Sequence, residues 1–223
     1  MLKGIGASVG IGIGNAVAIK DVELNIKKRT IDNCETELEL FNKALEHTKQ
    51  KSKSMAETLR KRVGNKEAEI LDGHVLLMSD PMLIAEVETG IRTQMLNSEY
   101  VLEDVCERFA AIFESMDNEL MQQRATDMRD IKTRLQKAVL GLEDVDLSEL
   151  EADSILIAKD LTPSMTAGLD PEKVAGIITQ FGGTTSHSAI LARALEIPAI
   201  LSVAEILDKV SDMHERRERR ALY

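Results

Sequence analysis

The stretch that decides the fold class is Val174-Ala175-Gly176-Ile177-Ile178, followed by GGTTSHSAILARALEIPAI at residues 182–200. The first run is short, apolar and β-branched, which is typical of a buried strand. Glycines and hydroxyl residues follow it, and a helical pattern begins near Ser188. A second apolar run of the same kind occupies residues 154–158. Buried strands that alternate with short helices predict an α/β layer. A strand is also predicted over residues 16–19, entered through a glycine-rich opening turn.

Residues 32 to 144 are charged, almost free of proline and helical in their periodicity. The clearest stripe recurs every three or four residues, which places it on one helix face; its members are Leu38, Phe41, Leu45, Thr48, Ser52, Met55 and Leu59. Gly64 predicts the end of that helix, and Ser79-Asp80-Pro81 predicts a capped break between two later helices. Several long helices with short joints predict a helical bundle.

Composition argues against several classes of function. The 223 residues carry a formal net charge of −10, and no basic stripe interleaved with aromatic residues is found, so a basic protein is a better partner than nucleic acid. No apolar run reaches the roughly 18 residues that a membrane span needs. Cys34 and Cys106 stand alone, without metal-ligand spacing around them, so we expect no metal site and a reducing, cytoplasmic setting.

The loop after the strand predicted at residues 174–178 carries the residues that could take part in chemistry. Gly182 and Gly183 allow the backbone to approach an anion closely, and a helix N-terminus follows with free N–H groups. Hydroxyl donors surround the histidine of this loop: Thr184, Thr185, Ser186 and Ser188. An imidazole keeps an unprotonated nitrogen near neutral pH, so His187 could attack phosphorus and form a covalent intermediate. The same residues fit an ordinary capped turn in which His187 bonds a neighbour, and spacing alone does not decide between the two readings.

Five segments carry a resemblance to a known family. Residues 182–200 closely resemble the phosphorylation signature of enzymes that use phosphoenolpyruvate, in which the histidine at the place of His187 is phosphorylated. The opening GIGASVGI at residues 4–11 is similar to the GxxASPGI of Enzyme I, with Val9 in place of the usual proline, and DLTPSMTA at residues 160–167 matches DLTPSxTA. Residues 72–78 and 124–131 resemble segments of the helical bundle inserted in that family. The chain is identified as a member of the Enzyme I family, as its N-terminal part.

The resemblance implies a fold and a division into domains. Residues 1–22 and 147–223 would form one discontinuous α/β phosphohistidine domain of the swivelling type. Residues 23–146 would form an inserted all-α helical bundle that binds HPr, the small phosphocarrier protein of the sugar phosphotransferase system. We therefore expect a phosphotransferase whose His187 exchanges a phosphoryl group with HPr.

The resemblance also implies roles for single residues. Thr166 would hold the ring of His187 at rest, and the signature loop would support catalysis through Gly182, Gly183, Thr185, Ser186, Ser188 and Arg193. Arg193 fits a phosphate contact and an exposed helix-face arginine equally well. Candidates for the HPr surface are His74, Leu76, Met78, Met82 and Leu83, which lie around the predicted helix break. Most of these fit the core of the bundle better, and His74 fits a structural histidine better than a partner contact.

The sequence departs from the family after residue 200. Relatives continue into closing strands and a barrel that binds phosphoenolpyruvate and magnesium, whereas Leu201–Tyr223 reads as helical and charged, ending in the solvated run Glu215–Arg220. We expect no cofactor in this chain, no use of phosphoenolpyruvate by it alone, and a monomer. Three alternatives stay open: the same fold in a nitrogen-regulatory or dihydroxyacetone-kinase phosphorelay, a helical binding module in which His187 is idle, and, against the long helical zone, the swivelling domain of a dikinase.

Overall fold

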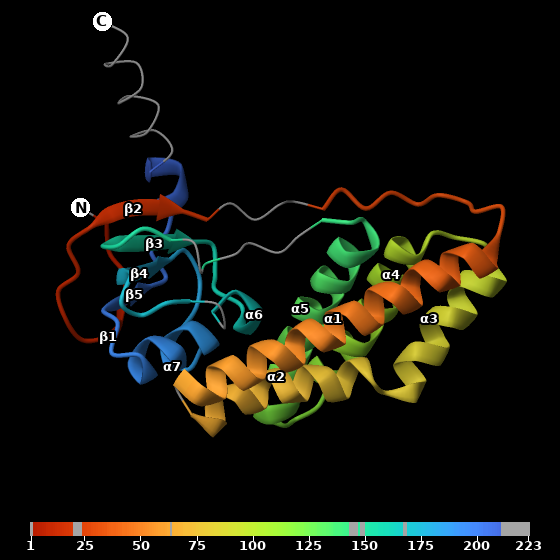
Figure 1. Ribbon diagram of the computed structural model, residues 1–223, viewed down its shortest axis with the longest axis horizontal. Helices are drawn as coiled ribbons and strands as arrows, with labels where there is room; N and C mark the ends of the chain where they lie inside the picture. Colours follow the sequence, from red (N-terminus) through yellow and green to blue (C-terminus); the bar gives the residue numbers. More distant parts are fainter. Residues whose placement is uncertain are drawn as a thin grey trace, which may run out of the picture. The chain divides into compact units, whose positions relative to one another are not determined.

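The structure, a computed structural model, describes residues 2–19, 24–62, 64–142, 147, 150–166 and 169–210 (Figure 1). The chain divides into two compact units. Residues 1–22 and 145–223 form an α/β unit, and residues 23–144 form a helical unit. The expected charged tail, Glu215–Arg220, lies outside the described residues.

The helical unit consists of long helices joined by short turns. They are α1 (Cys34–Arg62), α2 (Asn65–Met78), α3 (Pro81–Gln94), α4 (Ser98–Glu114) and α5 (Glu119–Val139). The predicted stripe of α1 points into the core, with every member buried except Met55, which is half-buried. The predicted break between α2 and α3 is also confirmed: the Asp80 carboxylate caps α3 by accepting the backbone N–H of Met82 at 2.7 Å, and Pro81 occupies the first turn.

One aliphatic and methionine-rich core holds this unit together, as the low aromatic content of the sequence requires. Its fully buried members come from all five helices, among them Phe41, Met78, Ile91, Leu102, Met128, Ile131 and Leu135. Each such side chain stabilises the folded unit by about 1.5 to 3 kcal/mol relative to an exposed one. Cys106 lies in the same core, where burial raises the pKa of its thiol to about 12.

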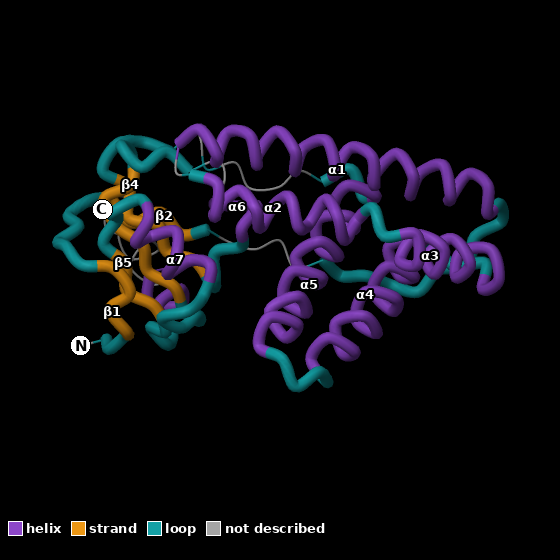
Figure 2. The backbone as a smooth tube through the Cα atoms, turned by 90° about the horizontal axis from the view of Figure 1, so that it is seen from below, coloured by secondary structure: helices purple, strands orange, loops and turns teal. Residues whose placement is uncertain are grey.

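The α/β unit is built on one mixed sheet (Figure 2). Its strands are β1 (Ile5–Ser8), β2 (Asn15–Ala18), β3 (Ser154–Ala158), β4 (Val174–Thr179) and β5 (Ala199–Leu201), in the order β1-β5-β4-β3-β2. All neighbours are parallel except β1 and β5. The short α6 (Pro163–Thr166) follows β3, and α7 (His187–Ala194) lies against β1 and β5. The expected fold class, an α/β domain with an inserted helical bundle, is confirmed.

The loop between β1 and β2 crosses the amino ends of the parallel strands. A Cβ atom added at Gly12 would lie 2.2 Å from the carbonyl oxygen of Ala175, and one at Gly14 would lie 1.9 Å from that of Asp153. The glycines therefore let this loop lie flat against the strand ends. Its other side chains point outward and are almost fully exposed, at 93% for Val9, 90% for Ile11 and 82% for Ile13.

Two strands differ from the sequence-based expectation. The opening residues 5–8, predicted as part of a flexible turn, form β1, and Leu201, predicted to begin a helix, ends β5. Both strands are only three or four residues long, so they carry too little alternation to show a period. They are ordered because they pair with each other at one edge of the sheet, with Ile5 opposite Leu201.

Candidate functional site

The signature loop lies at the carboxyl end of the parallel sheet, where α/β folds place their ligand sites. Strands β3 and β4 are hydrogen-bonded neighbours, so the segments that leave them run together. The backbone N–H of Gln180 donates to Ala158 at 3.0 Å, and that of Phe181 donates to Lys159 at 2.9 Å. The DLTPSMT segment after β3 and the GGTTSHS segment after β4 therefore lie side by side.

Hydrogen bonds to the backbone fix the start of the signature loop. Gly182 has a φ of +103°, a conformation that L side chains rarely adopt, and its carbonyl accepts the hydroxyl of Ser202 at 2.5 Å. The N–H of Ser186 then donates to the carbonyl of Gly183 at 3.0 Å, which closes a tight turn. Gly183 has open space where a side chain would begin, and Thr185 is exposed.

His187 is the first residue of α7 and is half-buried. Ser186 precedes it as the N-cap, with an oxygen that accepts the N–H of Ala189 at 3.3 Å. The ring stands at the positive end of the helix, where an anion is stabilised by the N–H groups of the first turn. This position suits an imidazole that carries a negatively charged group.

Thr166 does not share a hydrogen bond with His187 in the described part of the chain. Its hydroxyl donates within its own turn, to the carbonyl of Pro163 at 3.0 Å or that of Thr162 at 3.2 Å. A hydroxyl that donates to a carbonyl keeps lone pairs that can accept an imidazole N–H. The role expected for Thr166 stays a prediction.

Arg193 binds backbone carbonyls rather than standing free on its helix. Its guanidinium donates to the carbonyl of Ala7 in β1 at 3.2 Å and to that of Thr184 in the signature loop at 2.9 Å. The planar fork of an arginine suits two acceptors in fixed positions. Arg193 thus ties the loop before His187 to the edge of the sheet, an arrangement that sequence reasoning missed because carbonyl groups leave no mark in a sequence.

Asp160, which the sequence analysis did not single out, supplies a carboxylate that binds the signature loop. Ser188 is buried, and its hydroxyl donates to Asp160 Oδ1 at 3.3 Å. Ser188 Oγ also lies 2.9 Å from Ser186 Oγ. Asp160 lies two residues beyond the end of β3, so only the knowledge that β3 and β4 are neighbours could have placed it next to Ser188.

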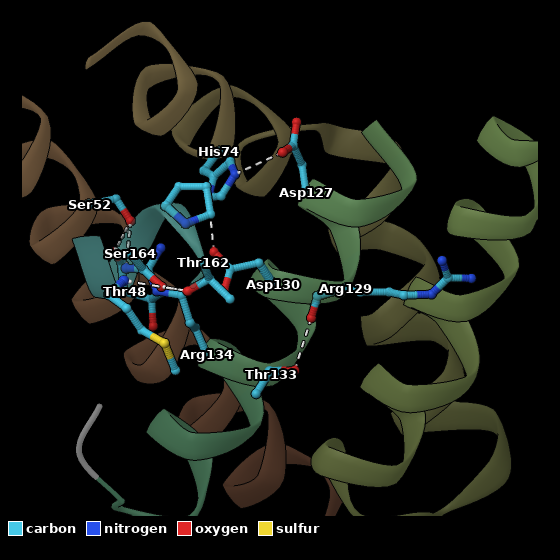
Figure 3. A network of polar contacts seen from close by, with 12 residues as sticks. Thr48, Ser52, His74, Asp127, Arg129, Asp130, Thr133, Arg134, Thr162 and Ser164 are labelled. Carbon is cyan, nitrogen blue, oxygen red and sulfur yellow. Dashed lines mark hydrogen bonds and ion pairs between the residues drawn. The ribbon is translucent and has the colours of Figure 1, made fainter. Parts of the chain in front are cut away.

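In the helical unit, His74 is fully buried among charged residues (Figure 3). Its Nε2 lies 3.4 Å from Asp127 Oδ1, and its Nδ1 lies 3.6 Å from Asp130 Oδ2. Arg124 Nη1 donates to the other oxygen of Asp127, Oδ2, at 3.3 Å. Nearby, Arg134 donates to the hydroxyl of Ser52 at 2.9 Å. Carboxylates on both sides of a buried ring describe a structural histidine inside the bundle.

The remaining candidates for the partner surface divide by exposure. Met78 and Leu83 are buried in the helical core together with the neighbouring turns. Leu76 and Met82 are exposed, at 73% and 66%, on either side of the break between α2 and α3. Only Leu76 and Met82 of the five named residues present an apolar side chain that a partner could cover.

The described residues contain no group of three or more histidine, cysteine, aspartate or glutamate side chains arranged to hold a metal ion. Within those same residues, no helix has the length and hydropathy required to cross a bilayer.

Two known protein families match this sequence. The family described as "PEP-utilising enzyme, N-terminal" matches residues 3–124, more than half of the chain, and the family described as "PEP-utilising enzyme, mobile domain" matches residues 150–216. The chain belongs to the PEP-utilising enzymes. Its recognition as an Enzyme I N-terminal part is confirmed as well, by the relatives and structures that it resembles.

The curated relatives carry the name phosphoenolpyruvate-protein phosphotransferase, a transferase. The protein of that name from Bacillus subtilis (strain 168) is 42% identical over 200 residues, which cover 90% of this chain and 35% of the relative. The one from Staphylococcus carnosus (strain TM300) is 39% identical over 209 residues, covering 94% of this chain and 36% of the relative. This chain thus spans little more than a third of the length of these relatives.

Solved structures agree with this family assignment. A solution structure of an Enzyme I protein is 40% identical, with a TM-score of 0.81, and the match covers 94% of this chain and 85% of that one. An N-terminal domain of "Enzyme 1 - Nitrogen" matches with a TM-score of 0.65 at 23% identity, covering 90% and 83% of the two chains. The second likeness shows the fold alone.

Proposed function

We propose that this chain is a phosphoryl-transfer module of the sugar phosphotransferase system, in which His187 accepts a phosphoryl group and exchanges it with HPr. The observation that carries the proposal is the position of His187. It opens α7 at the carboxyl end of the sheet, directly after a loop of glycines and hydroxyls, in a chain whose relatives are named phosphoenolpyruvate-protein phosphotransferase. Such a system works in the cytoplasm, which we propose as the location of this chain.

The transfer needs few groups beyond the imidazole. An unprotonated nitrogen of His187 attacks phosphorus, one N–P bond forms, and the bond to the donor breaks with its electron pair left on the donor atom. The proton on the other ring nitrogen stays in place. Charge on the transferred group is met by hydroxyls and helix N–H groups that are held before the group arrives, which is how phosphoryl transfer is usually stabilised.

We propose Leu76 and Met82 as the apolar part of the HPr surface. Both side chains flank a helix break and are exposed. Methionine adapts its shape to a partner, and apolar anchors at the centre of an interface carry much of the binding energy. The net charge of −10 favours a basic partner and fast association.

The experiment measures phosphoryl exchange between this chain and HPr in both directions. The rates at which labelled phosphoryl groups appear on the chain and leave it are recorded. We expect saturable transfer that His187→Gln abolishes and that Leu76→Ser with Met82→Ser slows through a higher KM. Binding without any transfer would favour the idle binding module. Transfer from a nitrogen-regulatory carrier, but not from HPr, would assign the chain to that phosphorelay. A folded chain that neither binds nor accepts from any carrier would contradict the proposal.

A further inference from the structure

The hydroxyls on either side of His187 are tied to one carboxylate. Ser186 and Ser188, the residues before and after the histidine, have their Oγ atoms 2.9 Å apart. Ser188 Oγ lies 3.3 Å from Asp160 Oδ1, and the same oxygen accepts the backbone N–H of Leu161 at 2.8 Å. Asp160 is thus fixed by its own backbone and reaches across to the first turn of α7.

The direction of these hydrogen bonds follows from the groups involved. An ionised carboxylate only accepts, so the proton of Ser188 points at Asp160. A hydroxyl has a single proton, and the contact between Ser186 and Ser188 must therefore use the proton of Ser186. The oxygen of Ser186 meanwhile accepts the N–H of Ala189. Each hydroxyl proton in these contacts therefore has a single acceptor. Asp160, the last acceptor, determines the direction of both hydroxyl hydrogen bonds.

We infer that Asp160 is a positioning residue for phosphoryl transfer at His187. This inference rests on the proposed function of that histidine. Asp160 acts through Ser188 and Ser186, holding both neighbours of His187 against the segment that follows β3. A small displacement of a reacting group costs a large factor in rate, because transfer requires the nucleophile in line with phosphorus. What the position requires is a hydrogen-bond acceptor rather than a negative charge, which would repel the phosphoryl group.

Two substitutions of Asp160 distinguish its role as a hydrogen-bond acceptor from the effect of its charge. Asp160→Ala removes the acceptor, whereas Asp160→Asn keeps a carbonyl oxygen for Ser188 and Leu161 and removes the charge. We expect Asp160→Ala to lower the rate constant at saturating phospho-HPr about tenfold with KM unchanged, the upper end of what the loss of one hydrogen bond costs. Asp160→Asn should stay within about threefold of the original chain. Asp170→Ala is the matched control, because Asp170 accepts a backbone N–H of Glu172 in the same unit without touching the loop.

A second donor makes the test independent of HPr. Phosphoramidate transfers its phosphoryl group to imidazole as its own N–P bond breaks and ammonia leaves with the electron pair. We expect the same loss for Asp160→Ala, the same rescue by Asp160→Asn, and melting temperatures within a few degrees for all variants. If the unchanged chain accepts from phosphoramidate but not from HPr, the proposed function fails while the role of Asp160 is still decided by this ratio.

Three results would overturn the inference. They are equal rates for Asp160→Ala and the unchanged chain, a loss that appears only as a higher KM, and a loss in Asp160→Asn as large as that in Asp160→Ala. Failure of both donors to label a folded chain would overturn it together with the proposed function.

Discussion

His74 and His187 are two histidines in opposite surroundings. His74 is fully buried in the helical unit between Asp127 and Asp130, whereas His187 is half-buried at the start of α7 in the α/β unit, beside hydroxyls and helix N–H groups. Acidic neighbours on both sides would repel a phosphoryl group from the first ring. Donors would attract it to the second. The groups around an imidazole, rather than the imidazole itself, therefore decide whether a histidine is a structural residue or a nucleophile.

The helical unit and the α/β unit also differ in where their polar residues lie. The helical unit buries several polar residues, among them His74, Asp127 and Arg134, and a buried polar group is costly unless it is paired. The α/β unit carries the glycines and hydroxyls of its signature loop at the end of the sheet, where Arg193 and Ser202 donate hydrogen bonds to the loop backbone. The first unit should therefore respond to substitution mainly in stability, and the second mainly in transfer.

The largest effect on stability should come from the buried histidine. His74→Ala would leave a cavity beside Asp127 and Asp130, and a large-to-small change at a fully buried site next to two buried carboxylates costs about 3 to 5 kcal/mol. Urea unfolding followed by helical circular dichroism measures it. His47→Ala, on the exposed face of α1, is the matched control and should change little. A loss below about 1 kcal/mol for His74→Ala would show that the helical core does not need the ring.

The next largest effect should be a difference in reactivity between the two cysteines. Burial raises the pKa of Cys106 from 9.0 to about 12, so its thiol stays protonated at pH 8, while Cys34 is only half-buried. We expect iodoacetamide to modify Cys34 at least about a hundredfold faster in the folded chain, and both equally in urea. Because the folded pKa lies above the unfolded one, this contribution to stability is present below pH 9 and is lost as the pH rises. Equal labelling of the folded chain would mean that the helical core opens.

A smaller loss is expected at the β1–β2 loop. Gly14→Ala would place a methyl group 1.9 Å from the carbonyl oxygen of Asp153, and forced overpacking costs about 1 to 3 kcal/mol. Gly6→Ala is the control, since open space surrounds that position in β1. Thermal unfolding of the α/β unit distinguishes them. Similar melting temperatures for both variants would mean that the loop does not lie flat against the strand ends.

The smallest change should come from the exposed apolar residues. Leu76→Ser should alter the free energy of unfolding by less than about 0.5 kcal/mol, whereas Met78→Ser, two residues along the same helix, should cost about 2 to 5 kcal/mol because Met78 is fully buried. Chemical denaturation measures both. A large loss for Leu76→Ser would place that side chain in the core and remove it from the proposed partner surface.

Much of the fold could be predicted because long periodic segments carry a strong signal. The stripe from Leu38 to Leu59 and the Ser79-Asp80-Pro81 break defined helices whose ends agree closely with the structure. Strands β1 and β5 could not be predicted, since three or four residues show no period and are ordered only by pairing with each other. The residues of the signature loop were identified from glycines and hydroxyls crowded around one histidine.

The rest of the site depends on tertiary contacts that no local pattern records. Asp160 reaches Ser188 only because β3 and β4 are neighbours in the sheet. Arg193 was left with two readings, and the structure gives a third, since it binds the carbonyls of Ala7 and Thr184. The burial of His74 likewise depends on two aspartates supplied by α5.

The most direct test of the central claim is to locate the phosphoryl group. The chain is incubated with phospho-HPr, digested at alkaline pH, where phosphohistidine is stable, and its peptides are analysed by mass spectrometry. Our account predicts one phosphorylated histidine, His187, and no label in the His187→Gln variant. A phosphoryl group on His74, His47 or any other residue, with His187 unmodified in a folded chain, would contradict it.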